Sequence, residues 1–192
     1  SSDLSQFVTG KLHRTNCKTA EMCKLTENSS RDVQIAFANE LSLICDKAGI
    51  NVWELIELAN KHPRVNILQP GCGVGGHCIA VDPWFLVELG GDTAQIIHLA
   101  RNTNDSMPSY TAQKTQSILN KAGIAGATVA VLGLAFKGNI DDMRESPSTI
   151  VIDELQKLGL NVISFDPHIK ENKHATQTQS LQEATANADI IL

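Results

Sequence analysis

The chain has 192 residues, of which 42% are hydrophobic and 19% are charged. This composition is typical of a globular protein, and the length suits one large domain or two small ones. Sixteen basic residues against 21 acidic residues give a formal net charge of −5, which argues against a nucleic-acid-binding protein with a basic face.

The sequence carries no signal for a membrane span, a secretory leader or a metal site. No long apolar run occurs, and residues 1–14 lack a basic segment followed by an apolar one. The five cysteines form no C-x-x-C pair, and the six histidines show no metal-ligand spacing. We therefore expect reduced thiols in a cytoplasmic protein and no bound metal. Because residues 188–192 have the pattern of an apolar strand that is just beginning, we expect the chain to be part of a longer protein.

A long helix is predicted near the start of the chain. Over residues 19–48 apolar side chains recur near the helical period, and no Gly or Pro occurs before Gly49. Thr19 is the predicted N-cap of this helix. Its length predicts a spine that packs against another domain or another subunit.

Shorter elements follow, separated by a loop rich in Gly and Pro over residues 63–83. Asn51 is a predicted N-cap for a second helix over residues 52–60. Structure resumes at 84–89, and two further helices are expected over 93–104 and 109–123, with Pro108 near the first position of the latter.

The pattern changes near Gly126, where we place the boundary between a helical domain, 1–125, and an α/β domain, 126–192. In the second domain, apolar strands alternate with helices, with strands expected at 128–132, 161–165 and 189–192 and helices at 148–158 and 181–187. This order predicts a parallel, doubly wound sheet with right-handed crossovers. The fold class is therefore an all-helical domain followed by a Rossmann-like parallel α/β domain.

The stretch 71–82 is rich in glycine and contains a cysteine. It has the G-x-G-x-x-G spacing, but Pro70 precedes it and no βαβ unit surrounds it, so we do not interpret it as a dinucleotide-binding motif. The glycines instead allow the backbone to approach a ligand closely. Cys78, four residues before Asp82, suits covalent catalysis by a thiolate. A buried structural cysteine is the alternative interpretation. A Cys78–His77 pair is disfavoured because adjacent residues seldom face each other.

Two other segments carry candidate binding groups. Lys24 and Asn28 share a face of the long helix, where they can hold a water or stabilise an oxyanion; a solvated helix face is the alternative. In the loop after strand 128–132, Lys137 and Arg144 can contact phosphates, and Phe136 can stack on a base. The alternative for this loop is an ordinary strand-to-helix connection with surface charges.

Taken together, these motifs closely resemble those of the UDP-glucose/GDP-mannose dehydrogenase family. The resemblance rests on three segments in the same order and covers most of the chain. They are Glu21-Met22-Cys23-Lys24-Leu25-x-x-Asn28, then Gly73-x-Gly75-Gly76-x-Cys78-x-x-x-Asp82, then Gly133-x-Ala135-Phe136-Lys137 with Asp142-x-Arg144-x-Ser146-Pro147.

The resemblance implies a two-step oxidation of the C6 alcohol of a UDP-sugar to a carboxylate, with two NAD as hydride acceptors. The position of Cys78 is that of the nucleophile, which forms a thiohemiacetal and then a thioester. The positions of Lys24, Asn28 and Asp82 are those of residues that position and activate water.

The resemblance also implies the binding residues and the assembly. The implied substrate contacts are Arg64 (across to the neighbouring subunit), Gly75, Gly76, Phe136 and Lys137, and the implied cofactor contact is Arg144. The long helix corresponds to the helix through which the family forms homodimers.

Three departures from the family pattern bear on these expectations. The NAD-binding domain that precedes these motifs in the family is absent from the 192 residues, so we expect the chain to be inactive alone. Cys72 stands where a proline is usual, and Ser30 stands where an aromatic residue is usual. The stretch 74–85 is most similar to the branch of the family that oxidises UDP-N-acetyl-D-mannosamine. The alternatives are UDP-N-acetylglucosamine or UDP-glucose as substrate, or a noncatalytic dimerisation and nucleotide-sugar-binding module.

Overall fold

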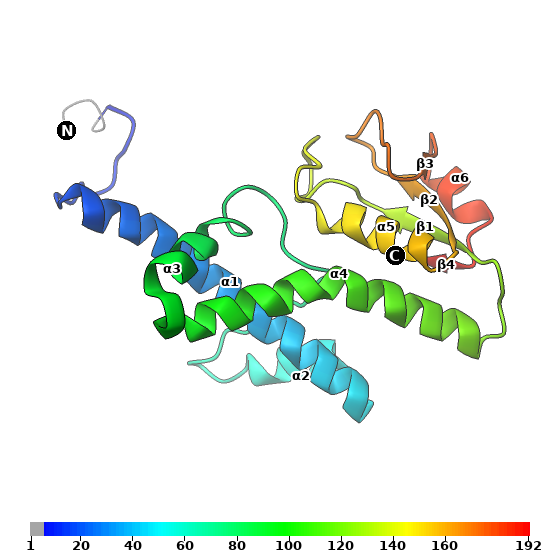
Figure 1. Cartoon of the computed structure of the whole chain (residues 1–192), viewed down its shortest axis with the longest axis horizontal. Helices are drawn as coiled ribbons and strands as arrows, with labels where there is room; N and C mark the ends of the chain where they lie inside the picture. Colours follow the sequence, from blue (N-terminus) through cyan, green and yellow to red (C-terminus); the bar gives the residue numbers. More distant parts are fainter. Residues whose placement is uncertain (1–5) are drawn as a thin grey trace.

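The computed structural model describes residues 6–192 and has a helical lobe followed by a sheet lobe (Figure 1). The expected fold class, a helical part followed by a parallel α/β part, is confirmed. The expected boundary at residue 125 stays a prediction; the last helix of the helical lobe ends at Lys121, and the first strand begins at Thr128. No helix within residues 6–192 is both long and apolar enough to cross a bilayer.

Helix α1 (Cys17–Ala48) is the predicted long helix, but its predicted N-cap is wrong. The cap is Asn16, whose Oδ1 accepts a hydrogen bond from the backbone N–H of Thr19 at 2.9 Å. An asparagine side chain satisfies one of the unpaired N–H groups of the first turn, so the helix starts two residues earlier. Gly49 ends α1 at φ 68°, a left-handed conformation that glycine adopts without strain.

The short helices of the first lobe largely follow the sequence. Helix α2 (Val52–Ala59) is capped by Asn51 as predicted, with Oδ1 accepting from the N–H of Trp53 at 3.0 Å. Structure resumes with α3 (Asp82–Gly90), two residues earlier than expected, and a short 3-10 turn (Gly91–Thr93) follows it.

Helix α4 (Gln95–Lys121) is one continuous helix, so the prediction of two helices at 93–104 and 109–123 is wrong. Pro108 lies inside it and is buried. A proline removes one backbone hydrogen bond and usually kinks a helix, and α4 bends along its length (Figure 1). The helix remains continuous because it packs against α1 in the helical lobe and against α5 (Pro147–Lys157) in the sheet lobe.

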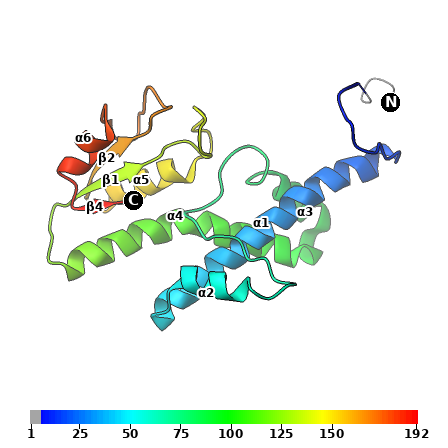
Figure 2. The ribbon, with the colours of Figure 1, turned by 180° about the vertical axis from the view of Figure 1, so that it is seen from behind.

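The sheet is parallel and has the strand order β3-β2-β1-β4. Strands β1 (Thr128–Leu132) and β2 (Asn161–Phe165) have the predicted bounds, and they pair along their whole length. Strand β4 (Ile190–Ile191) is shorter than expected, and β3 (Thr176–Gln177) was not predicted. The layers run from α4 through α5 and the sheet to α6 (Leu181–Ala186), as both views show (Figures 1 and 2).

The main hydrophobic core lies between the sheet and these helices. Fully buried side chains come from β1 (Val129, Val131), from α5 (Val151, Ile152, Leu155) and from α4 (Ala112, Leu119). Because α4 contributes to this core, burial of apolar surface holds the two lobes together as well as the sheet lobe itself.

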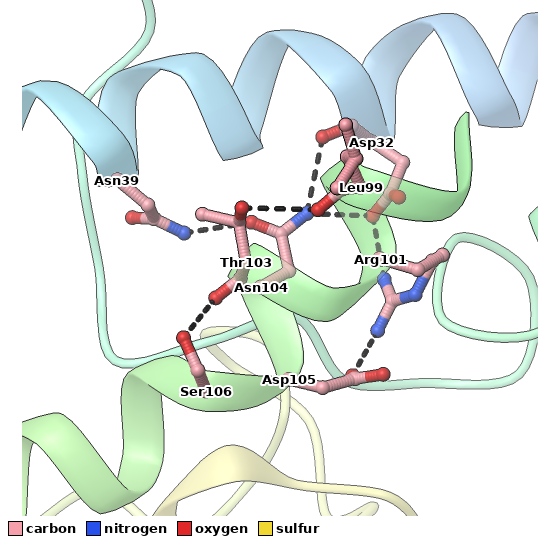
Figure 3. Close-up of polar contacts among 8 residues, drawn as sticks. All are labelled: Asp32, Asn39, Leu99, Arg101, Thr103, Asn104, Asp105 and Ser106. Atoms are coloured by element: carbon pink, nitrogen blue, oxygen red, sulfur yellow. Dashed lines mark hydrogen bonds and ion pairs between the residues drawn. The ribbon is translucent and has the colours of Figure 1, made fainter. Parts of the chain in front are cut away.

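A buried polar network joins α1 to α4 (Figure 3) and also reaches the glycine-rich loop. The side chains of Asp32 and Arg101 are 0% and 1% exposed, and Arg101 Nη1 lies 2.5 Å from Asp32 Oδ1. Asn104 donates to the same oxygen at 2.8 Å and accepts from Asn39 Nδ2 at 2.8 Å. Asn39 Oδ1 in turn accepts from the backbone N–H of Gly71 at 2.9 Å. The helix crossing therefore fixes where the loop begins.

Candidate functional site

Cys78 lies in a tight turn directly before α3. Its backbone carbonyl accepts hydrogen bonds from the N–H groups of Val81 at 3.2 Å and of Asp82 at 2.8 Å. The Cys78 side chain is exposed, which disfavours the alternative of a buried structural cysteine. The thiol is thus exposed to solvent, and the backbone of Cys78 is held by hydrogen bonds to the start of α3.

Asn28 and Asp82, two predicted catalytic residues far apart in the sequence, are in direct contact. Asn28 on α1 is 3% exposed, and its Nδ2 donates to Asp82 Oδ2 at 2.5 Å. Asp82 is the first residue of α3, where the helix dipole favours a carboxylate. The structure therefore holds a carboxylate four residues from the Cys78 thiol.

Lys24 lies one turn before Asn28 on the same face of α1, because residues four apart on a helix are neighbours. Its side chain is exposed. Within residues 6–192 it forms no hydrogen bond and no ion pair, so the ammonium group is available to a ligand.

Gly75 and Gly76 pack directly against the sheet lobe. A Cβ atom on Gly75 would lie 2.5 Å from the carbonyl oxygen of Glu145, and one on Gly76 would lie 2.7 Å from Phe136 Cε2. Gly76 also has φ 83°, which a residue with a side chain adopts only with strain. These glycines therefore make room for the sheet lobe; their predicted contact with substrate stays a prediction.

Lys137 lines a pocket of about 350 Å³ at the carboxyl ends of β1 and β2. Ligands of parallel α/β sheets bind at this edge. The carboxylate of Asp166 fixes the loop there, because its Oδ2 accepts from the N–H of Leu134 at 2.7 Å and from that of Ala135 at 3.2 Å. The predicted base- and phosphate-binding loop therefore stands at the expected edge of the sheet.

Arg144 is paired with Asp142 on the same loop. Arg144 Nε and Nη2 donate to the two carboxylate oxygens of Asp142 at 2.9 and 2.7 Å, and these bonds hold the pKa of the Asp142 carboxyl well below its usual value. The Arg144 side chain is 70% exposed, so it still offers donors to an anion.

Arg64, the remaining predicted substrate contact, is exposed in the turn that follows α2. Its backbone N–H donates to His62 Nδ1 at 3.3 Å. Within residues 6–192 no hydrogen bond or ion pair joins Arg64 to the other predicted site residues.

Sequence reasoning missed the polar residues that support the Cys78 turn. Asp32 and Asn39 are seven apart on α1, and Arg101 and Asn104 are three apart on α4, so each pair shares a face of its helix. The sequence signal for this network was the presence of polar residues at core-facing positions of both helices. Which of these residues pair with one another depends on how the two helices cross, and local sequence does not reveal that.

Comparison with known proteins gives the family of both lobes. Residues 18–106 match the central domain of the UDP-glucose/GDP-mannose dehydrogenase family, and residues 130–192 match its UDP binding domain. The chain is 53% identical to a UDP-N-acetyl-D-mannosamine dehydrogenase from Campylobacter jejuni, over 96% of this chain and 47% of that protein. It is 51% identical to an NDP-N-acetyl-D-galactosaminuronic acid dehydrogenase from Ralstonia nicotianae, over 97% and 44%.

A solved structure is also similar over both lobes. The UDP-D-ManNAc dehydrogenase from Pyrococcus horikoshii superposes with a TM-score of 0.88 at 41% identity, over 98% of this chain and 46% of that one. The chain thus spans about half the length of the relatives that it matches.

The close approach at Gly76 gives a stability prediction. Gly76→Ala places a methyl group against the Phe136 ring at positive φ, so we expect the free energy of unfolding to fall by about 1–3 kcal/mol. The matched control is Gly71→Ala in the same loop, where the added Cβ meets nothing within 4 Å and the N–H to Asn39 is retained. Urea denaturation of the two variants checks the difference; equal stabilities would contradict the close contact between the lobes.

Proposed function

The chain belongs to the UDP-glucose/GDP-mannose dehydrogenase family, and from that premise we propose that the protein containing it is an NAD-dependent UDP-N-acetyl-D-mannosamine 6-dehydrogenase. The observation that carries the proposal is the Cys78 turn, in which an exposed thiol lies four residues before a carboxylate held by Asn28. The names of the similar proteins from C. jejuni and P. horikoshii support the choice of sugar.

The proposed overall reaction converts a primary alcohol, two NAD⁺ and one water into a carboxylate, two NADH and three protons. After C6 of the sugar has lost its first hydride and a proton, the Cys78 thiolate adds to the aldehyde carbon, so that a C–S bond forms, the C=O π bond opens and a thiohemiacetal oxyanion results. Loss of the second hydride re-forms the C=O bond and leaves a thioester. Water then adds to this carbon, the C–S bond breaks, and the acid and the free thiolate are released.

The polar groups around the turn suit the steps that follow thiol addition. The Asp82 carboxylate can accept a proton from the attacking water, and its bond from Asn28 at 2.5 Å keeps it oriented. The Lys24 ammonium, on the same face of α1 as Asn28, can stabilise negative charge on the oxygen at C6. In this proposal, the Asp82 carboxylate activates water for hydrolysis, and the Lys24 ammonium stabilises the negative charge on the oxygen at C6.

The sheet lobe is proposed to hold the nucleotide. Lys137 stands at the pocket over the strand ends and can neutralise the diphosphate of UDP. Phe136 is half-buried against Gly76, and the rest of its ring can contact the nucleotide sugar. Arg64 is exposed on the helical lobe, as a residue that reaches the substrate of a neighbouring subunit must be.

The described residues fit one edge of an NAD site. The exposed guanidinium of Arg144 suits a phosphate of the dinucleotide, whereas the G-x-G-x-x-G spacing at 71–76 lies between two helices and not between a strand and a helix. When bound, NAD supplies the acceptor for both hydrides. We propose that the chain by itself does not turn over substrate, because most of this site would have to come from elsewhere.

The comparisons also support alternative sugars as the substrate. The R. nicotianae relative is named for an N-acetylgalactosaminuronic product, and UDP-N-acetylglucosamine and UDP-glucose are further candidates. The candidates are separated by comparing kcat/KM for four substrates: UDP-N-acetylmannosamine, UDP-N-acetylgalactosamine, UDP-N-acetylglucosamine and UDP-glucose.

A second proposal is that two copies of the chain form a homodimer through α1. For this chain alone, the corresponding function is that of a noncatalytic module that dimerises and binds a nucleotide sugar. Phe37 and Ile44 lie seven residues apart on one face of α1 and are 54% and 53% exposed. The buried face of α1 instead carries polar residues such as Asn28, Asp32 and Asn39. Large apolar side chains on the exposed face of a helix favour a partner on that side.

Replacement of the thiol tests the proposed reaction. In the protein that contains this chain, we expect two NADH per UDP-N-acetylmannosamine consumed, and we expect Cys78→Ser to form no acid, because a serine hydroxyl is a far weaker nucleophile. Cys23→Ser, an exposed cysteine outside the turn, is the matched control and should keep full activity. Normal acid production by Cys78→Ser would rule out the covalent step.

The assembly is tested by placing a charge on the exposed face of α1. We expect Ile44→Glu to convert a dimer into a monomer in sedimentation velocity, since a carboxylate buried in an apolar interface is strongly unfavourable. Ile118→Glu on α4, where the isoleucine is 45% exposed, should leave the dimer intact. A monomeric wild-type protein would refute this assembly.

A further inference from the structure

His77 directly precedes the proposed nucleophile, yet the proposed reaction gives it no task. Its side chain crosses to the sheet lobe: Nε2 lies 3.6 Å from Asp142 Oδ2, and its ring meets the Phe136 ring edge-on with centroids 6.4 Å apart. His77 therefore contacts a carboxylate, Asp142, and an aromatic ring, Phe136, on the loop that is proposed to hold the nucleotide.

Asp142 connects this contact to a second proposed ligand-binding residue. The oxygen that faces His77 also accepts from Arg144 Nη2 at 2.7 Å, and the backbone carbonyl of Asp142 accepts from the N–H of Phe136 at 3.1 Å. One carboxylate residue thus links the residue beside the thiol, the proposed cofactor contact and a proposed substrate contact.

We propose that His77 and Asp142 form a clasp that positions the Cys78 turn against the loop 136–144. The inference rests on the proposed function and adds two positioning residues to it. The clasp joins the part of the site that attacks the sugar carbon to the part that holds the nucleotide, so the thiol and the substrate keep one relative position.

The composition of the turn explains why such a clasp is needed. Gly73, Gly75 and Gly76 give the backbone before Cys78 great freedom, and fixing glycine residues costs more conformational entropy than fixing any others. His77 is the first residue after these glycines with a side chain long enough to reach the sheet lobe. A contact at this position restrains the thiol directly, because Cys78 is the next residue in the chain.

Hydrogen exchange tests the clasp without relying on activity. In the protein that contains this chain, His77→Gln and Asp142→Asn should each raise amide exchange in the segment 73–78 by about two- to fivefold, the range of a partly exposed side-chain pair. The double variant should exchange no faster than the Asp142→Asn variant, because Asp142→Asn already removes the contact that His77 makes with this carboxylate. His174→Gln is the matched control, since His174 makes a similar pair with Asp153 at 3.0 Å elsewhere in the sheet lobe.

Kinetics separate positioning from general stability. His77→Gln should lower kcat about two- to fivefold with KM for the UDP-sugar within a factor of about two. Unchanged or additive exchange in the variants, or an unchanged kcat in His77→Gln, would overturn the clasp. If the wild-type protein oxidises no UDP-sugar, the proposed function fails, and the exchange experiment still decides the clasp.

Discussion

A charged pair buried between α1 and α4 determines where the reactive turn can lie. Taking Asp32 and Arg101 out of water is costly, and burial raises the pKa of the Asp32 carboxyl against the opposing effect of Arg101. Within residues 6–192 Asn104 donates to Asp32 Oδ1 and Asp105 accepts from Arg101, whereas Asp32 Oδ2 and Arg101 Nε are buried without a partner. From Asn104 the network continues through Asn39 to the N–H of Gly71. These bonds form at the observed crossing of the two helices, and they fix where the loop starts.

The Cys78 turn is consequently held at three points. Asn39 fixes the beginning of the glycine-rich segment, and the Asn28–Asp82 hydrogen bond fixes the end that enters α3. Between them, Gly75 and Gly76 are pressed against the sheet lobe. A segment that would be loose in isolation thereby becomes a defined site, and the restraint comes from packed helices and a sheet, which place reactive groups more accurately than free loops do.

Local patterns predicted those parts of the fold that local physics decides. The periodicity of α1, the apolar run of β1 and the cap at Asn51 follow from nearby residues, and the structure agrees with them. The break expected at Pro108 was wrong, because packing of α4 against both lobes outweighs the lost hydrogen bond. Strand β3 has two residues and exists through pairing with β2, which no local pattern reveals. At the site, Asn28 and Asp82 were singled out separately, but their contact depends on how α1 meets α3.

Cys78 is the proposed covalent centre, while the neighbouring Cys72 is packed against the hydrophobic core, where burial raises the pKa of its thiol. The most direct test is mass spectrometry of the acid-quenched Asp82→Asn variant after incubation with NAD and UDP-N-acetylmannosamine, with the modified residue located by fragmentation. We expect a thioester adduct of the oxidised nucleotide sugar on Cys78 and none on Cys72, because loss of the Asp82 carboxylate slows hydrolysis. Acid formation without any adduct on Cys78, or an adduct on Cys72 instead, would contradict it.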